Sequence, residues 1–143
     1  MAITSSLVSY WCTIGFLEIN NLLRTGEVSD RNRGDEEYMM EDAQTLIAAA
    51  QSHYSGIVYR GIAGECDGTY SDKGLSSWTT HKEMAETFAR KRSEQTGKPA
   101  LLLTMDAAQG FDIQAFLEER GEESSQCEIL IAPGSYKVEV EVL

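Results

Sequence analysis

Apolar residues in the first third of the chain recur at helical spacing. Residues 9–25 carry apolar side chains three and four positions apart, and Gly26 follows as a C-terminal stop. The charged stretch 27–38 predicts an exposed loop, and a second helix is expected over about 39–51. The apolar stripes of the two helices are Phe16, Ile19, Leu22 and Leu23, then Met40, Ala43, Leu46, Ile47 and Ala50.

The pattern becomes strand-like after Gly56. Residues 57–60 predict a short strand that Gly61 ends. The polar, glycine-rich stretch 64–73 predicts a loop, and residues 75–78 predict a second short strand.

A third helix is expected in the middle of the chain. Thr80 and Glu83 have the spacing of a capping box, which predicts a helix to about residue 95 that Gly97 ends. The continuous apolar run 100–105 then predicts a strand. We expect the buried face of this helix to consist of Met84, Ala85, Phe88 and Ala89.

The C-terminal third favours short strands. Residues 110–113 predict an extended piece and 114–120 a brief helix or turn. Pro133 and Gly134 suit a type II turn, so the apolar run before them and the alternating residues after them predict a β-hairpin. Helices first and mostly antiparallel strands afterwards indicate an α+β fold. The alternating apolar positions are Tyr136, Val138, Val140 and Val142.

Composition indicates an ordinary globular domain. The chain has 143 residues, of which 42% are hydrophobic and 24% charged, and we expect one domain over 1–143. The formal net charge of −11 argues against direct binding to nucleic acid or to an anionic membrane, since both need a basic face. The cysteines are few and widely spaced, which predicts neither a disulfide framework nor a zinc site: Cys12, Cys66 and Cys127.

The ends of the chain and its apolar runs bear on where the protein acts. The first residues lack the basic segment and the apolar core of a signal peptide. No apolar run approaches the ~20 residues of a membrane span. Together with the cysteine pattern, these features predict a cytoplasmic protein.

Three short polar islands lie near the ends of predicted strands, at 59–61, 76–79 and 126–128. In an extended chain, residues two apart point to the same face, so Gln126 and Glu128 would face one cleft. A hairpin alone does not explain why a carboxylate opens an apolar run. The islands are therefore candidates for a site.

In their order and distances, the islands resemble the Arg–Ser–Glu motifs of mono-ADP-ribosyltransferases, both clostridial-toxin-like and small phage-type enzymes. These proteins carry an arginine on the first core strand, Ser-x-Ser/Thr on a later strand and (Gln/Glu)-x-Glu near the C-terminus. The resemblance covers about residues 15–142. It implies helices packed on a split, mainly antiparallel β-sandwich core with a central NAD cleft. Further similar segments are Asn20-x-Leu22-Leu23-Arg24-x-Gly26, Ala85-x-x-Phe88-Ala89 and Gly110-x-Asp112-Ile113.

The resemblance implies that NAD is the co-substrate and that no metal takes part. Glu128 would stabilise positive charge on the ribose when the nicotinamide bond breaks, and would hydrogen-bond the 2′-hydroxyl. Ser77 would orient Glu128 by a hydrogen bond. Arg60 would hold the phosphates and the adjoining ribose, which suits its planar, permanently charged guanidinium, although a surface arginine at a strand end is the simpler alternative. Gly61 would let the nicotinamide amide approach the backbone, unless it is an ordinary turn glycine.

Other positions in the islands are less specific. Thr79 would support the strand behind the site, while Thr79 or Thr80 could instead cap the following helix. Trp78 and Thr79 depart from the Ser-Thr-Ser form of the best-known toxins, which leaves the branch of the family open. An aromatic ring is expected to stack on nicotinamide, and each candidate could instead belong to the core: Phe88, Tyr70 and Trp78.

Gln126 bears on the acceptor side chain. By resemblance, Glu-x-Glu enzymes tend to modify arginine, and Gln-x-Glu enzymes tend towards asparagine, glutamine or other acceptors. An amide can match the donor and the acceptor of another amide. Glu122 and Glu123 lie in the same loop, so an arginine acceptor stays open.

The expected activity is that of a small intracellular effector, similar to compact phage- or bacterium-encoded ones, that modifies one host or rival protein. The acidic composition favours a basic partner, such as a nucleic-acid-binding protein, and we expect a monomer. Two alternatives remain. One is an NAD glycohydrolase that modifies no protein, and the other is a non-catalytic inhibitor that binds a basic protein through its acidic face.

Overall fold

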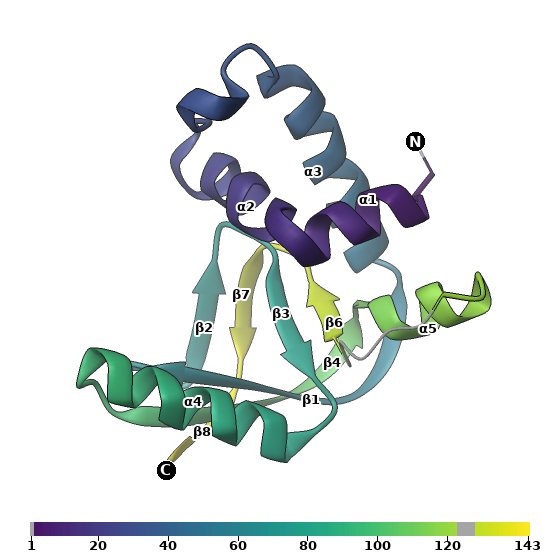
Figure 1. Ribbon diagram of the computed structural model, residues 1–143. Helices are drawn as coiled ribbons and strands as arrows, with labels where there is room; N and C mark the ends of the chain where they lie inside the picture. Colours follow the sequence, from purple (N-terminus) through teal and green to yellow (C-terminus); the bar gives the residue numbers. More distant parts are fainter. Residues whose placement is uncertain (1, 123–127) are drawn as a thin grey trace.

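The N-terminal helices gather at one end of the strands (Figure 1). The structure, a computed structural model, describes residues 2–122 and 128–143. Helix α1 (Ser5–Tyr10), a π-helical turn η1 (Trp11–Gly15) and α2 (Phe16–Thr25) follow one another directly, so the predicted first helix begins at Ser5 rather than at residue 9. The Thr4 hydroxyl caps it by accepting a hydrogen bond from the Leu7 N–H at 3.2 Å.

The second helix also begins earlier than its apolar stripe indicates. The stretch predicted as a loop contains a short 3₁₀ turn, η2 (Asp30–Asn32), and α3 spans Glu36–Ala50. The first turn of α3 is acidic, which favours a helix N-terminus. This turn has no apolar periodicity, so the sequence pattern did not predict it as helix. Within the described ranges, no helix has the length and apolar character needed to cross a membrane.

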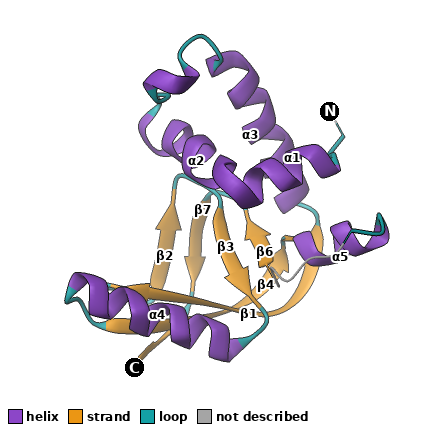
Figure 2. Ribbon diagram, in the orientation of Figure 1, coloured by secondary structure: helices purple, strands orange, loops and turns teal. Residues whose placement is uncertain are grey.

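In the part of the chain that the structure describes, the strands form two antiparallel sheets (Figure 2). Within residues 2–122 and 128–143, the larger sheet has six strands in the order β5-β6-β3-β1-β4-β8, and the smaller pairs β2 with β7. The α+β fold class is therefore confirmed, with α4 (Lys82–Thr96) and α5 (Ile113–Glu119) between strands. The strands are β1 (His53–Ala63), β2 (Thr69–Asp72), β3 (Ser76–Thr79), β4 (Ala100–Gln109), β5 (Phe111–Asp112), β6 (Glu128–Ile131), β7 (Gly134–Lys137) and β8 (Glu139–Val142).

Two apolar cores lie on opposite faces of the larger sheet. The first joins α1–α3 and α5 to the sheet through residues such as Leu46, Ile113 and Leu130. The second contains Val58 and Trp78 of the larger sheet, and side chains of the smaller sheet pack against it. Because neighbouring residues of a strand point to opposite faces, β6 contributes Leu130 to the first core and Ile129 and Ile131 to the second.

Two predictions about the first strands are wrong. Strand β1 spans His53–Ala63 and continues through Gly61, which pairs with Leu102 of β4. The stretch 64–73, predicted as a loop, contains β2. The partly exposed N-terminal half of β1 and the polar sequence of β2 lack an apolar alternation, so only the part of β1 around the buried Val58 gave a strand signal.

The predicted C-terminal hairpin is also wrong. Strand β6 pairs with β3 and β5, whereas β7 pairs with β2, so the strands on either side of Pro133 belong to different sheets. The alternating stretch after Pro133 forms two strands, β7 and β8, and β8 pairs with β4. The turn residues correctly predict a reversal of direction, but they do not choose the pairing partner.

Helix α4 lies along β1, and Gly61 lets it approach closely. A Cβ atom at Gly61 would lie 1.9 Å from the Ala85 carbonyl oxygen, well inside any normal contact. Ala85 and Ala89 are buried, as predicted, but Met84 and Phe88 are 46% and 54% exposed. The prediction that all four form the buried face is therefore half wrong. The capping box is wrong as well, because the helix is capped at His81 without a side-chain hydrogen bond.

Candidate active site

A cleft opens where β1 and β3 separate. The two strands pair at one position, Tyr59 with Thr79. Beyond it they diverge, and Gly61 and Ser77, which a continued register would pair, instead line a cavity of about 880 Å³. The π-helical turn and α2 form one wall, and α4 supplies Phe88 to another. A second cavity of about 230 Å³ adjoins it between β1, β3 and α4.

Strand alternation places Ser77 and Thr79 on the cleft side of β3. Ser76 and Trp78 point the other way and are buried, with the Trp78 indole N–H donating to the Ser76 hydroxyl at 2.8 Å. Thr79 pairs with Glu128 across β3 and β6, so both side chains project from the same face. The Thr79 hydroxyl also accepts a hydrogen bond from the His81 N–H at 3.1 Å, as expected of a residue that leads into a helix.

Glu128, the first residue of β6, brings a carboxyl group into both cavities. Its Oε2 atom is buried and has no hydrogen-bond partner among the described residues. Burial raises the pKa of the Glu128 carboxyl, and this effect outweighs hydrogen bonding from Ser77 and Trp11 and the positive charge of Arg60. The carboxyl is therefore held in a poorly hydrated position that lacks a full set of partners.

Arg60 reaches the cleft from the centre of β1. Its Nη1 donates to the Ser77 carbonyl oxygen at 2.7 Å, and its guanidinium lies over the ring of Tyr70, 5.5 Å from the centroid. The buried Nε of Arg60 has no partner among the described residues. Arg60, Ser77 and Glu128 thus meet at the point where β1 and β3 separate, as the sequence predicts.

The structure places the remaining predicted site residues in different environments. Phe88 is exposed at the cleft and lines both cavities, whereas Trp78 belongs to the core. Tyr70 lies behind Arg60 and is absent from the described lining of either cavity. The close packing of α4 requires a glycine at position 61. This packing, and not an ordinary turn, is the structural alternative to a role of Gly61 in a nicotinamide contact. Gln126 lies outside the described residues.

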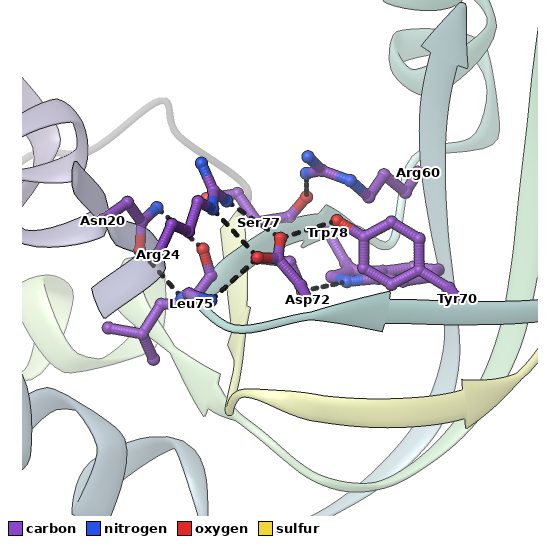
Figure 3. A network of polar contacts seen from close by, with 10 residues as sticks. Asn20, Arg24, Arg60, Tyr70, Asp72, Leu75, Ser77 and Trp78 are labelled. Carbon is purple, nitrogen blue, oxygen red and sulfur yellow. Dashed lines mark hydrogen bonds and ion pairs between the residues drawn. The ribbon is translucent and has the colours of Figure 1, made fainter. Parts of the chain in front are cut away.

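Helix α2 contributes residues that the sequence predictions did not place in the site. The Asn20 side chain donates to the Leu75 carbonyl at 2.9 Å and accepts from the Leu75 N–H at 2.8 Å, which fixes α2 beside the start of β3 (Figure 3). Arg24 lines the cleft and forms two hydrogen bonds with Asp72. The Asn20 to Arg24 segment, quoted above for the family resemblance, was the available signal.

The π-helical turn brings two further residues to the cleft, Trp11 and Cys12. Such turns are rare and often occur at functional sites. Gly15 permits it, because a Cβ there would lie 2.7 Å from the Tyr10 ring. Burial, with a smaller contribution from the charge of Glu128, raises the pKa of the Cys12 thiol to about 11, so this cysteine is a poor nucleophile.

The cleft is positively charged in a protein that is strongly acidic. Three arginines line the larger cavity, while Glu128 is the one acidic residue in its described lining: Arg24, Arg60 and Arg92. Guanidinium groups in a concave site favour an anionic ligand, phosphate in particular. Among residues 2–122 and 128–143, no group of three or more His, Cys, Asp and Glu side chains could hold a metal ion.

Sequence comparison gives no match, either to protein-family models or to curated proteins. Comparison with solved structures does. Vis toxin, an ADP-ribosyltransferase from Vibrio splendidus, is similar at 17% identity and a TM-score of 0.64, over 99% of this chain and 74% of that one. Vis in complex with an inhibitor gives 19% identity and a TM-score of 0.69, with the same coverage.

Exoenzyme S from Pseudomonas aeruginosa, in a complex with human 14-3-3 protein beta and carba-NAD, is also similar. The TM-score is 0.57 at 16% identity, over 90% of this chain and 61% of that one. These likenesses extend over 90–99% of this chain. The chain therefore has the fold of the mono-ADP-ribosyltransferases.

Proposed function

We propose that this protein is an NAD-dependent mono-ADP-ribosyltransferase that transfers ADP-ribose to a side chain of another protein. One observation carries the proposal. Arg60, Ser77 and Glu128 come from three strands that are far apart in the sequence, and they meet in one cleft of an ADP-ribosyltransferase fold. A structural role for any one of them would not require the other two to be beside it.

The cleft suits NAD in size and in polarity. Its volume of about 880 Å³ falls within the ~300–1,000 Å³ of typical small-molecule sites. Arg60 Nε is a buried donor and Glu128 Oε2 a buried acceptor, and neither has a partner in the described part of the chain. Buried polar atoms normally have partners, so a ligand that offers an acceptor to Arg60, such as a phosphate oxygen, and a donor to Glu128, such as a hydroxyl group, would satisfy both. NAD has both, and exoenzyme S has been solved with carba-NAD.

When bound, NAD supplies ADP-ribose by cleavage of its bond between nicotinamide and ribose. The role of Glu128 is electrostatic, because a fixed carboxylate beside the ribose stabilises the positive charge that develops there. Poor hydration strengthens that interaction, and the same burial raises the pKa of the carboxyl. Ser77 holds the carboxyl in orientation, and Arg60 fixes the phosphates. Gly61, Thr79 and Phe88 complete the nicotinamide end of the cleft.

The acceptor belongs to a protein, and the net charge of −11 favours one with a basic surface. Gln126 favours an amide acceptor such as asparagine or glutamine. Vis has been solved with agmatine, which carries a guanidinium group like that of arginine, so acceptor mapping must include arginine. We expect the protein to act in the cytoplasm of the producing or target cell, as a small effector.

The test compares the wild type with Glu128→Gln, which keeps the size of the side chain and removes its charge. Glu119→Gln, on the exposed end of α5, is the matched control. Each protein is incubated with labelled NAD and a cell lysate, while label on protein and free nicotinamide are measured. A discrete labelled protein that requires Glu128 supports the transferase. Nicotinamide release without labelled protein would instead support the glycohydrolase, and no activity in either assay would contradict both.

A further inference from the structure

Tyr70, on β2, supports the arginine of the candidate active site from behind. The Arg60 guanidinium lies over the Tyr70 ring, 5.5 Å from the ring centroid, and the Tyr70 and Trp78 rings pack together with their centroids 5.6 Å apart. The two rings are almost perpendicular, at 89°, a favourable arrangement for aromatic pairs. Trp78 is fully buried, so the Tyr70 ring has a fixed base.

The Tyr70 hydroxyl links this support to Arg24. It donates to Asp72 Oδ2 at 2.9 Å, and the same carboxylate accepts from Arg24 Nε at 2.9 Å and Nη2 at 2.8 Å (Figure 3). The Gly74 N–H also donates to Asp72, at 2.8 Å. Burial alone would raise the pKa of Asp72, but hydrogen bonds from Arg24, Gly74 and Tyr70 hold it below its usual range. Asp72 is therefore charged at neutral pH.

Tyr70 and Asp72 themselves do not appear in the described lining of either cavity. They nevertheless hold two of the three arginines that line the larger cavity. The Tyr70 ring lies under the Arg60 guanidinium, and Asp72 accepts two hydrogen bonds from Arg24. Both supporting residues come from β2, whose only described strand partner is β7. The smaller sheet thus connects the strand side of the cleft, at Arg60, with its helix side, at Arg24.

We infer that Tyr70 and Asp72 are positioning residues that hold Arg60 and Arg24 in a fixed relative geometry for a diphosphate ligand. This inference rests on the proposed function for the identity of the ligand, NAD. A paired guanidinium arrangement loses little conformational freedom on binding when both groups are already held. The smaller sheet then has a role in substrate binding without touching the substrate.

The experiment replaces Tyr70 by leucine, which removes the π face under Arg60. The matched control is Tyr136→Leu, because Tyr136 is the direct cross-strand partner of Tyr70 and packs against the same core without contacting Arg60. Steady-state nicotinamide release then gives KM for NAD and kcat separately. A partly buried cation–π contact corresponds to about 5–30-fold in affinity. We expect Tyr70→Leu to raise KM by that factor with kcat nearly unchanged, and Tyr70→Phe to restore most of the loss.

Tyr136→Leu should lower thermal stability to a similar degree and leave KM unchanged. Equal KM changes in both leucine variants, or no change in Tyr70→Leu, would overturn the inference. If the wild type releases no nicotinamide, the proposed function fails instead. A double-mutant cycle of Tyr70→Leu and Arg60→Met, followed by thermal unfolding, then decides the inference: coupling between the two sites supports it, and additive effects overturn it.

Discussion

Replacing Gly61 by alanine places a methyl group where α4 already lies. The new Cβ would be 1.9 Å from the Ala85 carbonyl oxygen and 2.9 Å from the Ala89 nitrogen. Carbon and oxygen atoms in close contact normally stay about 3.3 Å apart, so the helix must move by roughly 1.4 Å. Because both obstacles are backbone atoms, no side-chain rotation can relieve the clash.

The cost follows from the size of this displacement. Overpacking costs about 1–3 kcal/mol, and a backbone clash belongs at the upper end of that range. For a chain of this length, about 3 kcal/mol corresponds to a fall in Tm of roughly 6–12 °C. Because α4 carries Phe88 into the cleft, its movement should also impair the proposed binding of NAD.

The assay is thermal unfolding followed by circular dichroism, together with KM for NAD. Gly56→Ala is the matched control, because Gly56 lies in the same strand and its Cβ would meet the Tyr54 hydroxyl at an ordinary 3.4 Å. We expect that variant to range from unchanged to about 1 kcal/mol more stable. A Gly61→Ala protein as stable as the wild type would refute the packing argument.

Three further predictions concern titratable groups. The pKa of Glu128 is raised in the folded protein. The stability that this group contributes is therefore complete below its unfolded pKa and is lost as the pH rises through its folded pKa. Glu128→Gln should accordingly unfold at a higher temperature than the wild type at pH 7.5 but not at pH 4. Because the pKa of Cys12 is about 11, alkylation of the folded protein at pH 7 should leave this thiol unmodified in a peptide map, and rapid labelling would contradict its assignment as inert. Asp72→Asn weakens the partly buried pair with Arg24 and should cost about 1–2 kcal/mol of unfolding free energy, whereas Asp106→Asn, at an exposed position of β4, should cost almost nothing.

The sequence predicted the parts of the fold that rest on apolar periodicity. The stripes of α2 and α3 and the apolar run of β4 gave three elements, because burial on one or both faces leaves a pattern in the residue types. The ends of these elements were missed where polar residues, and not apolar spacing, mark the boundary of the element. Strand β2 was missed for a similar reason, since its sequence is polar and only its pairing with β7 makes it a strand.

The candidate site was predictable in outline because its residues lie at strand ends in a recognisable order. Arg60, Ser77 and Glu128 are brought together, as expected, while the Tyr70 ring lies under the Arg60 guanidinium and not in the described lining of the cleft. Asp72 could not be identified, because an aspartate in a glycine-rich stretch predicts a turn just as well. Its role depends on a contact 48 positions away along the chain, with Arg24.

Labelled NAD, the purified protein and a lysate provide the most direct test of the central claim. The account predicts transfer of label to protein by the wild type and by Glu119→Gln, and a loss of about 10²–10³ in rate for Glu128→Gln. Mass spectrometry of the labelled protein would then identify the acceptor side chain. Equal labelling by wild type and Glu128→Gln would contradict the account, because the carboxylate at the centre of the cleft would then have no part in the chemistry.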